Sequence, residues 1–140
     1  MAHIQELEDA VTATESWVNA LAERIGWRNR RKAYQALVTT LHALRDYLPT
    51  GEAVYLAAQL PPLLRGIYYE GWHPTGHPFP IENRSEFLDR IQEGMHRDPA
   101  IDAERIARDV LAELARHLPS GELEDAKAAT PKPLRALWPG

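Results

Sequence analysis

The sequence LHALRDYLPTGEAVYLAAQLPPLLR at residues 41–65 returns at residues 111–135 as LAELARHLPSGELEDAKAATPKPLR. At an offset of 70 residues the alignment extends without a gap, so that Glu15–Glu70 pairs with Ser85–Gly140. Twelve of these 56 pairs are identical, against about four expected for unrelated sequences of ordinary composition. A long repeat that occurs only twice predicts an internal duplication with two units packed face to face, because an open solenoid needs three or more units.

The apolar residues of both units recur at helical spacing. In the first unit they line two consecutive segments: Trp17, Val18, Leu21 and Ile25, then Ala33, Leu37, Leu41, Leu44 and Leu48. In the second unit the corresponding sets are Phe87, Leu88 and Ile91, then Ile106, Val110, Leu114 and Leu118. No stretch alternates with period two, so the sequence predicts an all-α fold, an internally duplicated helical bundle of two pseudo-twofold-related units.

Polar residues and glycine mark the expected ends of these helices. Thr12 to Glu15 has the pattern of a capping box and predicts a helix start, Gly26 predicts its end, and Asn29 caps the next helix. Further predicted N-caps are Thr50, Asn83, Ser120 and Thr130, the last followed by a proline at the first helical position.

The chain divides into two repeat units and a connecting crossover within one expected domain, residues 1–140. Unit 1 covers about residues 12–70, the crossover residues 70–84, and unit 2 about residues 85–140. Prolines and glycines exclude a regular helix from the crossover. Trp72, Phe79 and Ile81 are nevertheless too apolar for a freely solvated linker. We therefore expect an ordered segment that lies across the bundle and is anchored by its aromatic groups.

Composition excludes several classes of protein. The 140 residues are 44% hydrophobic and 26% charged, which is typical of a soluble globular chain. There is no cysteine, so disulfides, thiolate nucleophiles and cysteine-based metal sites are ruled out. The longest apolar runs are too short for a membrane span, and the first residues do not form a signal peptide. We expect a cytoplasmic location without membrane attachment.

Four strings resemble a bacterial family catalogued only as domain of unknown function number 2267. They are LRDYLP at residues 44–49, LRGIYYEGW at residues 64–72, and GELED at residues 121–125 followed by LRALWP at residues 134–139. The resemblance covers nearly the whole chain from about Thr12. It implies a small, all-helical, internally duplicated bacterial protein of the cytosol. It implies no activity, because the family has no established catalytic or ligand residues to carry over.

The crossover contains two histidines, His73 and His77, four residues apart. This spacing suits a metal on a helix, where both imidazoles share one face. Pro74 and Gly76 exclude that geometry here, and no third ligand is specified. Solvent-facing histidines are the simpler interpretation, so we predict no metal and no cofactor.

Arginine and aromatic residues gather where unit 1 meets the crossover. Arg65, Tyr69, Glu70, Trp72, His73 and His77 form the candidate binding set. Arginine with aromatic groups is the composition of an interface hot spot or a ligand pocket. Arg65, however, has a counterpart in Arg135, which favours an architectural role for that residue. Tyr69, Glu70 and Trp72 have no such counterpart, so a site is expected there.

The charge pattern bears on nucleic-acid binding and on catalysis. A basic patch, residues 28–32 with Arg24 nearby, could meet a phosphate or an internal carboxylate. The net charge of −4 and the lack of a recognition motif argue against nucleic acid. Paired carboxylates, Gly-rich phosphate loops and nucleophile motifs are missing, and Asp46 is a carboxylate without a partner in sequence, so no catalytic residue is assigned.

These observations favour a non-enzymatic module that binds an unknown partner protein through the aromatic crossover. A homodimer that buries Trp72 is one form of this hypothesis. The first alternative is a small-molecule or metal-binding protein, with or without catalysis, whose cleft lies between the two repeats. The second is nucleic-acid binding through residues 28–32.

Overall fold

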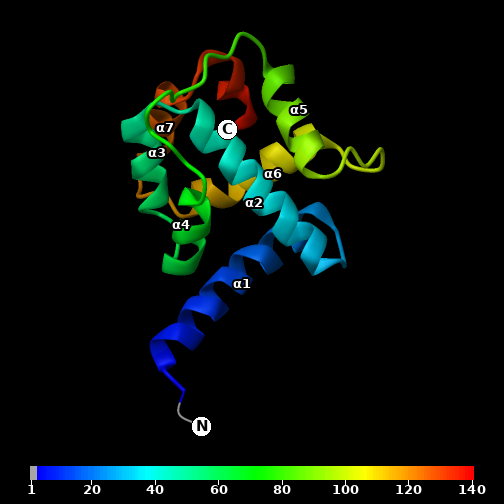
Figure 1. Ribbon diagram of the computed structural model, residues 1–140, viewed down its shortest axis with the longest axis vertical. Helices are drawn as coiled ribbons and strands as arrows, with labels where there is room; N and C mark the ends of the chain where they lie inside the picture. The colour runs from blue at the N-terminus through cyan, green and yellow to red at the C-terminus, as the bar shows by residue number, and fades with distance from the viewer. Residues whose placement is uncertain (1–2) are drawn as a thin grey trace.

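The computed structural model describes residues 3–140 and is all-helical (Figure 1). Among these residues there is no strand, which confirms the predicted fold class. The elements are α1 (Gln5–Ile25), α2 (Arg30–Tyr47), α3 (Thr50–Ala57), α4 (Pro62–Tyr69), α5 (Arg84–Gly94), α6 (Ala103–Arg116), α7 (Leu123–Ala129) and the 3₁₀ helix η1 (Lys132–Leu137). None of these helices combines the length and the apolar character that a membrane span requires.

The order of elements follows the sequence repeat. Helices α5, α6, α7 and η1 come after the crossover as α1, α2, α3 and α4 come before it. Helix α1 packs against α2 and α6, and α5 packs against α6 and α2, so that each half supplies a helix to the other. The contacts of α4 with α1 and α2 likewise have counterparts in those of η1 with α5 and α6. This pattern is the one a duplication produces, and common descent of the halves remains a prediction.

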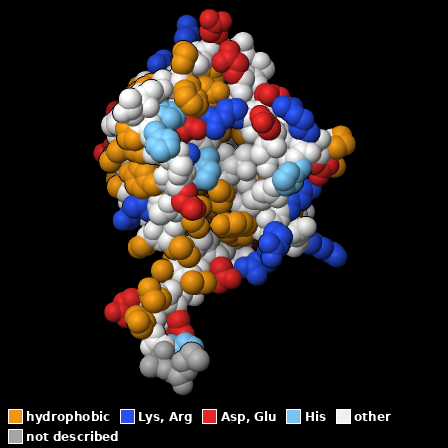
Figure 2. Space-filling model, in the orientation of Figure 1, with side chains coloured by type: hydrophobic (Ala, Val, Ile, Leu, Met, Phe, Trp, Pro, Cys, Tyr) orange, Lys and Arg blue, Asp and Glu red, His pale blue; other side chains and the backbone are white. Residues whose placement is uncertain are grey.

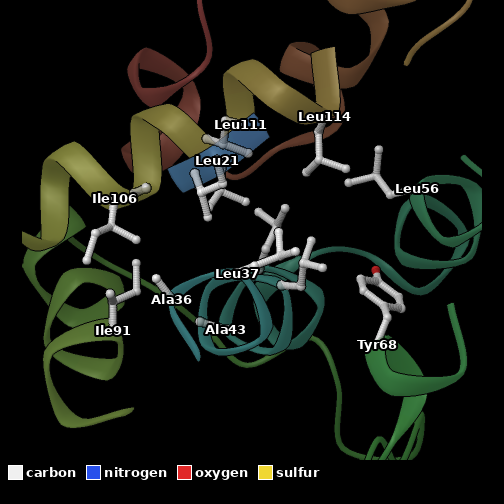
Figure 3. Packing of buried hydrophobic residues seen from close by; sticks show 14 of the residues in the cluster. Leu21, Ala36, Leu37, Ala43, Leu56, Tyr68, Ile91, Ile106, Leu111 and Leu114 are labelled. Atoms are coloured by element: carbon white, nitrogen blue, oxygen red, sulfur yellow. The ribbon is translucent and has the colours of Figure 1, made fainter. Parts of the chain in front are cut away.

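The core fills the space between the two halves (Figure 3). Leucines from α1, α2 and α6 meet at its centre, where Leu21, Leu37 and Leu111 are fully buried. Ile91 of α5 and Ile106 of α6 close one end, and Tyr68 of α4 closes the other. Side chains of this size in full burial each contribute about 1.5–3 kcal/mol to folding. The boundary between the repeats is therefore a packed apolar interface.

Several predicted helix ends are confirmed. Gly26 ends α1 in the left-handed conformation, with φ of 87°. Asn29 caps α2 by accepting a hydrogen bond from the Lys32 amide at 3.0 Å. Asn83 caps α5 in the same way from the Glu86 amide at 3.3 Å.

Four predicted caps are wrong. Helix α1 begins at Gln5 and not within the capping-box pattern of residues 12–15. The acidic residues 5–11 contain no proline or glycine that would break a helix, so the helix extends back through them. The Thr14 hydroxyl instead donates to the Ala10 carbonyl one turn back, at 2.9 Å. Residues 50 and 120 are not caps either, since α3 and α7 begin after Pro49 and Glu122. Thr130 ends α7, and its hydroxyl donates a hydrogen bond to the Ala126 carbonyl.

Candidate functional site

A buried carboxylate at the end of α2 organises the densest group of polar side chains near the crossover. Asp46 is 5% exposed. It accepts hydrogen bonds from Arg45 Nε at 3.0 Å and from Arg90 NH2, on α5, at 2.7 Å. His77 Nε2 of the crossover lies 3.3 Å from the same carboxylate. We call Arg45, Asp46, His77 and Arg90 the Asp46 cluster; it joins two helices and the crossover through charge-assisted contacts.

Arg45 extends this cluster to the end of α4. Its NH1 donates to the carbonyls of Tyr68 and Glu70, at 2.5 and 2.6 Å. The last carbonyls of a helix have no partners within the helix and carry the negative end of its dipole. A buried guanidinium at this position therefore satisfies them and fixes where the crossover leaves the bundle.

The crossover lies against the end of α2 and does not hang free. The Phe79 amide donates to the Asp46 carbonyl at 2.8 Å. The aromatic rings of the crossover and of Tyr69, at the end of α4, lie close together. The ring centroids of Tyr69 and Trp72 are 5.5 Å apart, and those of His77 and Phe79 are 4.4 Å apart. The expectation of an ordered segment anchored by aromatic groups agrees with these contacts.

Part of this group of aromatic side chains reaches the surface. Phe79 is 42% exposed, and Tyr69 and Trp72 are half-buried. The Arg90 guanidinium lies over the Phe79 ring, 5.8 Å from its centroid. We call Tyr69, Trp72 and Phe79 the aromatic row; it is a hydrophobic strip with a cation beside it, on a backbone that is hydrogen-bonded to the end of α2.

The expectation that both histidines of the crossover face solvent is wrong for His77, whose side chain is only 10% exposed. His77 turns its imidazole inward to Asp46, and its Nδ1 meets the His73 carbonyl. His73 itself is exposed. Within residues 3–140 no three His, Asp or Glu side chains gather in positions that could hold a metal ion.

Arg65 has a structural contact. It donates to the carbonyls of Ala57 and Leu60 at 3.1 and 2.9 Å, and so holds the end of α3. Arg135, its counterpart at the offset of 70, donates to the carbonyls of Thr130 and Ala128 at 2.8 and 3.2 Å, and so holds the end of α7. The same task in both halves supports the architectural interpretation of Arg65. The Glu70 side chain is exposed, and its backbone carbonyl is the group that Arg45 uses.

Sequence reasoning missed the Asp46 cluster. Apart from the adjacent Arg45, the partners of Asp46 are distant along the chain: His77 and Arg90 reach it only after folding. One signal was available: Arg45 and Asp46 interrupt a segment whose other members, such as Leu44 and Leu48, are core residues. Two adjacent charges in a buried segment need partners.

A second buried carboxylate with similar partners lies on the α1–α6 side. Glu113 is 1% exposed and faces Arg116 NH1 at 2.8 Å, Arg24 NH2 at 3.5 Å and His117 Nε2 at 3.3 Å. Each half of the molecule thus buries one carboxylate among two arginines and a histidine. Glu113 and Asp46 do not correspond at the offset of 70, so the two clusters are built from different positions.

Surface clefts flank both clusters. One, between α1 and α6, is lined by Ala20, Glu23, Arg24, Glu113 and Arg116; the other, of about 330 Å³, is lined by Thr39, His42, Ala43, Arg90, Glu93 and Gly94 of α2 and α5. In the second cleft, burial lowers the pKa of His42 below its ordinary value of 6.5, although a hydrogen bond to the Ile67 carbonyl at 2.7 Å opposes this effect. His42 therefore favours the neutral form here.

The predicted basic patch is partly neutralised within the chain. Arg30 pairs with Glu15 at 3.6 Å, and Lys32 pairs with Asp98 at 3.8 Å. These contacts support the interpretation in which internal carboxylates balance the patch.

Comparison with protein families gives one finding. A model described as an uncharacterised conserved protein, DUF2267, matches residues 14–137, nearly the whole chain. No curated protein matches the chain.

Proposed function

Since the chain belongs to the uncharacterised conserved family DUF2267, we propose its function from the site: a non-enzymatic module that binds a partner protein through the crossover. The observation that carries this proposal is the aromatic row on a backbone fastened by the Asp46 cluster. Aromatic and arginine side chains dominate the binding energy of protein interfaces. A segment already held in place loses little conformational entropy when a partner docks.

The chemistry of the row suggests the kind of partner. Phe79 and Trp72 offer apolar surface, while His73 and Arg90 bring donors and positive charge to the same neighbourhood. A partner segment with an apolar side chain beside a carboxylate fits both features. The proposal includes a cytoplasmic location in a bacterium, which the lack of cysteine supports because small secreted domains commonly depend on disulfides.

The test compares two surface variants of matched exposure. Phe79→Ser removes the most exposed ring of the row, and Val54→Ser makes a comparable change on α3, where Val54 is 48% exposed. Proteins cross-linked to each variant in the native host are identified, and candidate partners are purified and titrated against it. We expect Phe79→Ser to weaken one partner at least tenfold, about 1.4 kcal/mol, while Val54→Ser leaves its binding unchanged.

The outcome also separates the proposal from simple misfolding. Both variants should keep the circular dichroism spectrum and the melting temperature of the parent within a few degrees, because both positions lie at the surface. A partner that both variants retain equally would refute the crossover as the binding element, as would a Trp72→Ala variant that binds all partners normally.

A ligand-binding function is the second candidate, favoured by the cleft beside His42 and Arg90. The interface between the repeats is filled by core side chains, so a ligand would occupy this surface cleft. Native mass spectrometry of the protein purified from its host tests this candidate. A bound small molecule lost in an Arg90→Ala variant would support it, and a bare polypeptide mass would count against it.

A further inference from the structure

The first turns of α1 extend beyond the bundle as an arm. Figure 1 shows this part of the helix projecting away from the other elements, and Figure 2 shows hydrophobic side chains along it. We call residues 4–13 the arm. Its apolar side chains are exposed: Ile4 by 58%, Leu7 by 63% and Val11 by 48%. The family match begins at residue 14, so the arm lies just outside it.

The exposed side chains form one stripe that continues into the core. Leu7 and Val11 are four residues apart on one face of α1, and Ile4, the N-cap residue, precedes Leu7 by three. Val18, seven residues after Val11, continues this stripe and is buried in the bundle. The seam that packs α1 inside the molecule thus runs outward without a partner. Removing these exposed apolar side chains from water against a partner surface would be favourable.

The same surface carries a groove with apolar groups next to the stripe. Between α1 and α2 it is lined by Glu15, Val18, Arg30, Arg31 and Tyr34, and along α2 it continues past Arg31, Tyr34, Gln35, Val38 and Thr39. Tyr34 is 40% exposed. The arm and the groove adjoin, because Val11, Glu15 and Val18 follow one another on one side of α1.

Charge differs between the two ends of this surface. The arm carries exposed Glu6, Glu8 and Asp9. Arg30 and Arg31 line the groove; Arg30 pairs there with Glu15, so Arg31 is the cation that can face the arm. A surface that is acidic and apolar at one end and basic and apolar at the other is complementary to itself when a twofold axis reverses it. Each arm then meets the groove of the other copy.

We infer that this surface pairs with a second copy of the chain: the arm of each protomer lies in the α1–α2 groove of its partner. Ile4, Leu7 and Val11 cover Tyr34 and Val38, and the acidic flank of the arm faces Arg31. This contact is independent of the crossover, so a dimer leaves the aromatic row open to another protein.

The expected association is moderate. Only a few apolar side chains per copy enter the contact, which puts it near the lower limit of stable interfaces, about 1,200 Å² in total. We expect a dissociation constant on the order of 10 µM and a rise in mass toward the dimer as concentration increases.

Sedimentation velocity of the full chain from about 1 to 300 µM tests the inference, with variants at both ends of the surface. Leu7→Lys on the arm, Glu8→Arg on the arm and Arg31→Glu in the groove should each raise the dissociation constant at least tenfold. Since every copy carries both ends, the double variant Glu8→Arg with Arg31→Glu should recover most of the affinity. Val54→Lys, on the exposed face of α3, is the matched control and should dimerise like the parent.

The results that overturn the inference are distinct. A chain that stays monomeric over the whole range refutes it, as does a dimer that Leu7→Lys and Arg31→Glu leave intact. Open-ended growth into larger assemblies would contradict the twofold arrangement. A dimer that Trp72→Ala disrupts, with Leu7→Lys neutral, would assign self-association to the crossover instead. Circular dichroism of each variant verifies that the monomer fold is kept.

Discussion

Removal of the Asp46 carboxylate is expected to loosen the crossover and to destabilise the whole molecule. In Asp46→Ala, Arg45 loses the carboxylate that faces it at 3.0 Å, while its side chain remains only 7% exposed. Leaving a buried charge without its partner costs about 3–5 kcal/mol. Arg90 is 32% exposed and can turn to water, so we expect the lower end of this range, about 3 kcal/mol.

The conservative variant calibrates this figure. Asp46→Asn keeps the volume and one acceptor oxygen, so that Arg45 can still donate to it, and the expected loss is about 1–2 kcal/mol. Urea unfolding followed by circular dichroism measures both changes as shifts in the free energy of unfolding. For a chain of this size the loss in Asp46→Ala corresponds to a fall in melting temperature of roughly 10 °C.

A local measurement separates loosening of the crossover from general weakening. The Phe79 amide donates to the Asp46 backbone carbonyl, so its hydrogen exchange reports whether the crossover stays docked. We expect this exchange to accelerate in Asp46→Ala by more than that of core amides in α6. A loss of stability below about 1 kcal/mol, or unchanged protection at Phe79, would refute the role given to the Asp46 cluster.

Three further changes test other parts of the structure. Gly94→Ala should lower the free energy of unfolding in urea by about 1–3 kcal/mol, because the new Cβ would lie 2.8 Å from the Thr39 hydroxyl. Gly66→Ala, with open space around it, should instead raise that free energy by about 0.5–1 kcal/mol. Equal effects would contradict the close approach of α5 to α2. The lowered pKa of His42 means that the unfolded chain binds more protons as pH falls below 6.5, so stability should decrease on acidification from there, and His42→Gln should flatten this part of the pH profile. Thr130→Val removes the hydroxyl that accepts the hydrogen bond of the Trp138 indole N–H. It should lower the melting temperature by roughly 3–6 °C, for a loss of about 1–2 kcal/mol. An unchanged melting temperature would show that this hydrogen bond is dispensable.

The sequence predicted the fold well where a residue acts through its own backbone neighbourhood. Gly26, Asn29 and Asn83 end or cap helices as expected, because left-handed backbone and short-range amide bonds depend on a few adjacent residues. The start of α1 was mispredicted, since a hydroxyl such as that of Thr14 serves equally well as a cap or as a donor to the preceding turn.

The candidate site was predicted in outline only. The crossover stands out in sequence because it is a single-copy aromatic segment between two repeats. The contacts that hold the crossover in place were not predicted, because the pairing of Asp46 with His77 and Arg90 depends on how α2, α5 and the crossover meet in space. The local pattern shows that Arg45 and Asp46, two charges within a buried segment, need partners. It does not show which distant residues supply them.

The exchange of helices between the halves has a consequence for how the molecule acquires its structure. Helices α1 and α5 each pack on the long helix of the opposite half, so neither half has a finished interior of its own. The nucleus for folding must therefore join segments far apart along the polypeptide, and its formation is slower than that of a bundle built from neighbours. Once assembled, the two halves are expected to unfold together as one cooperative unit.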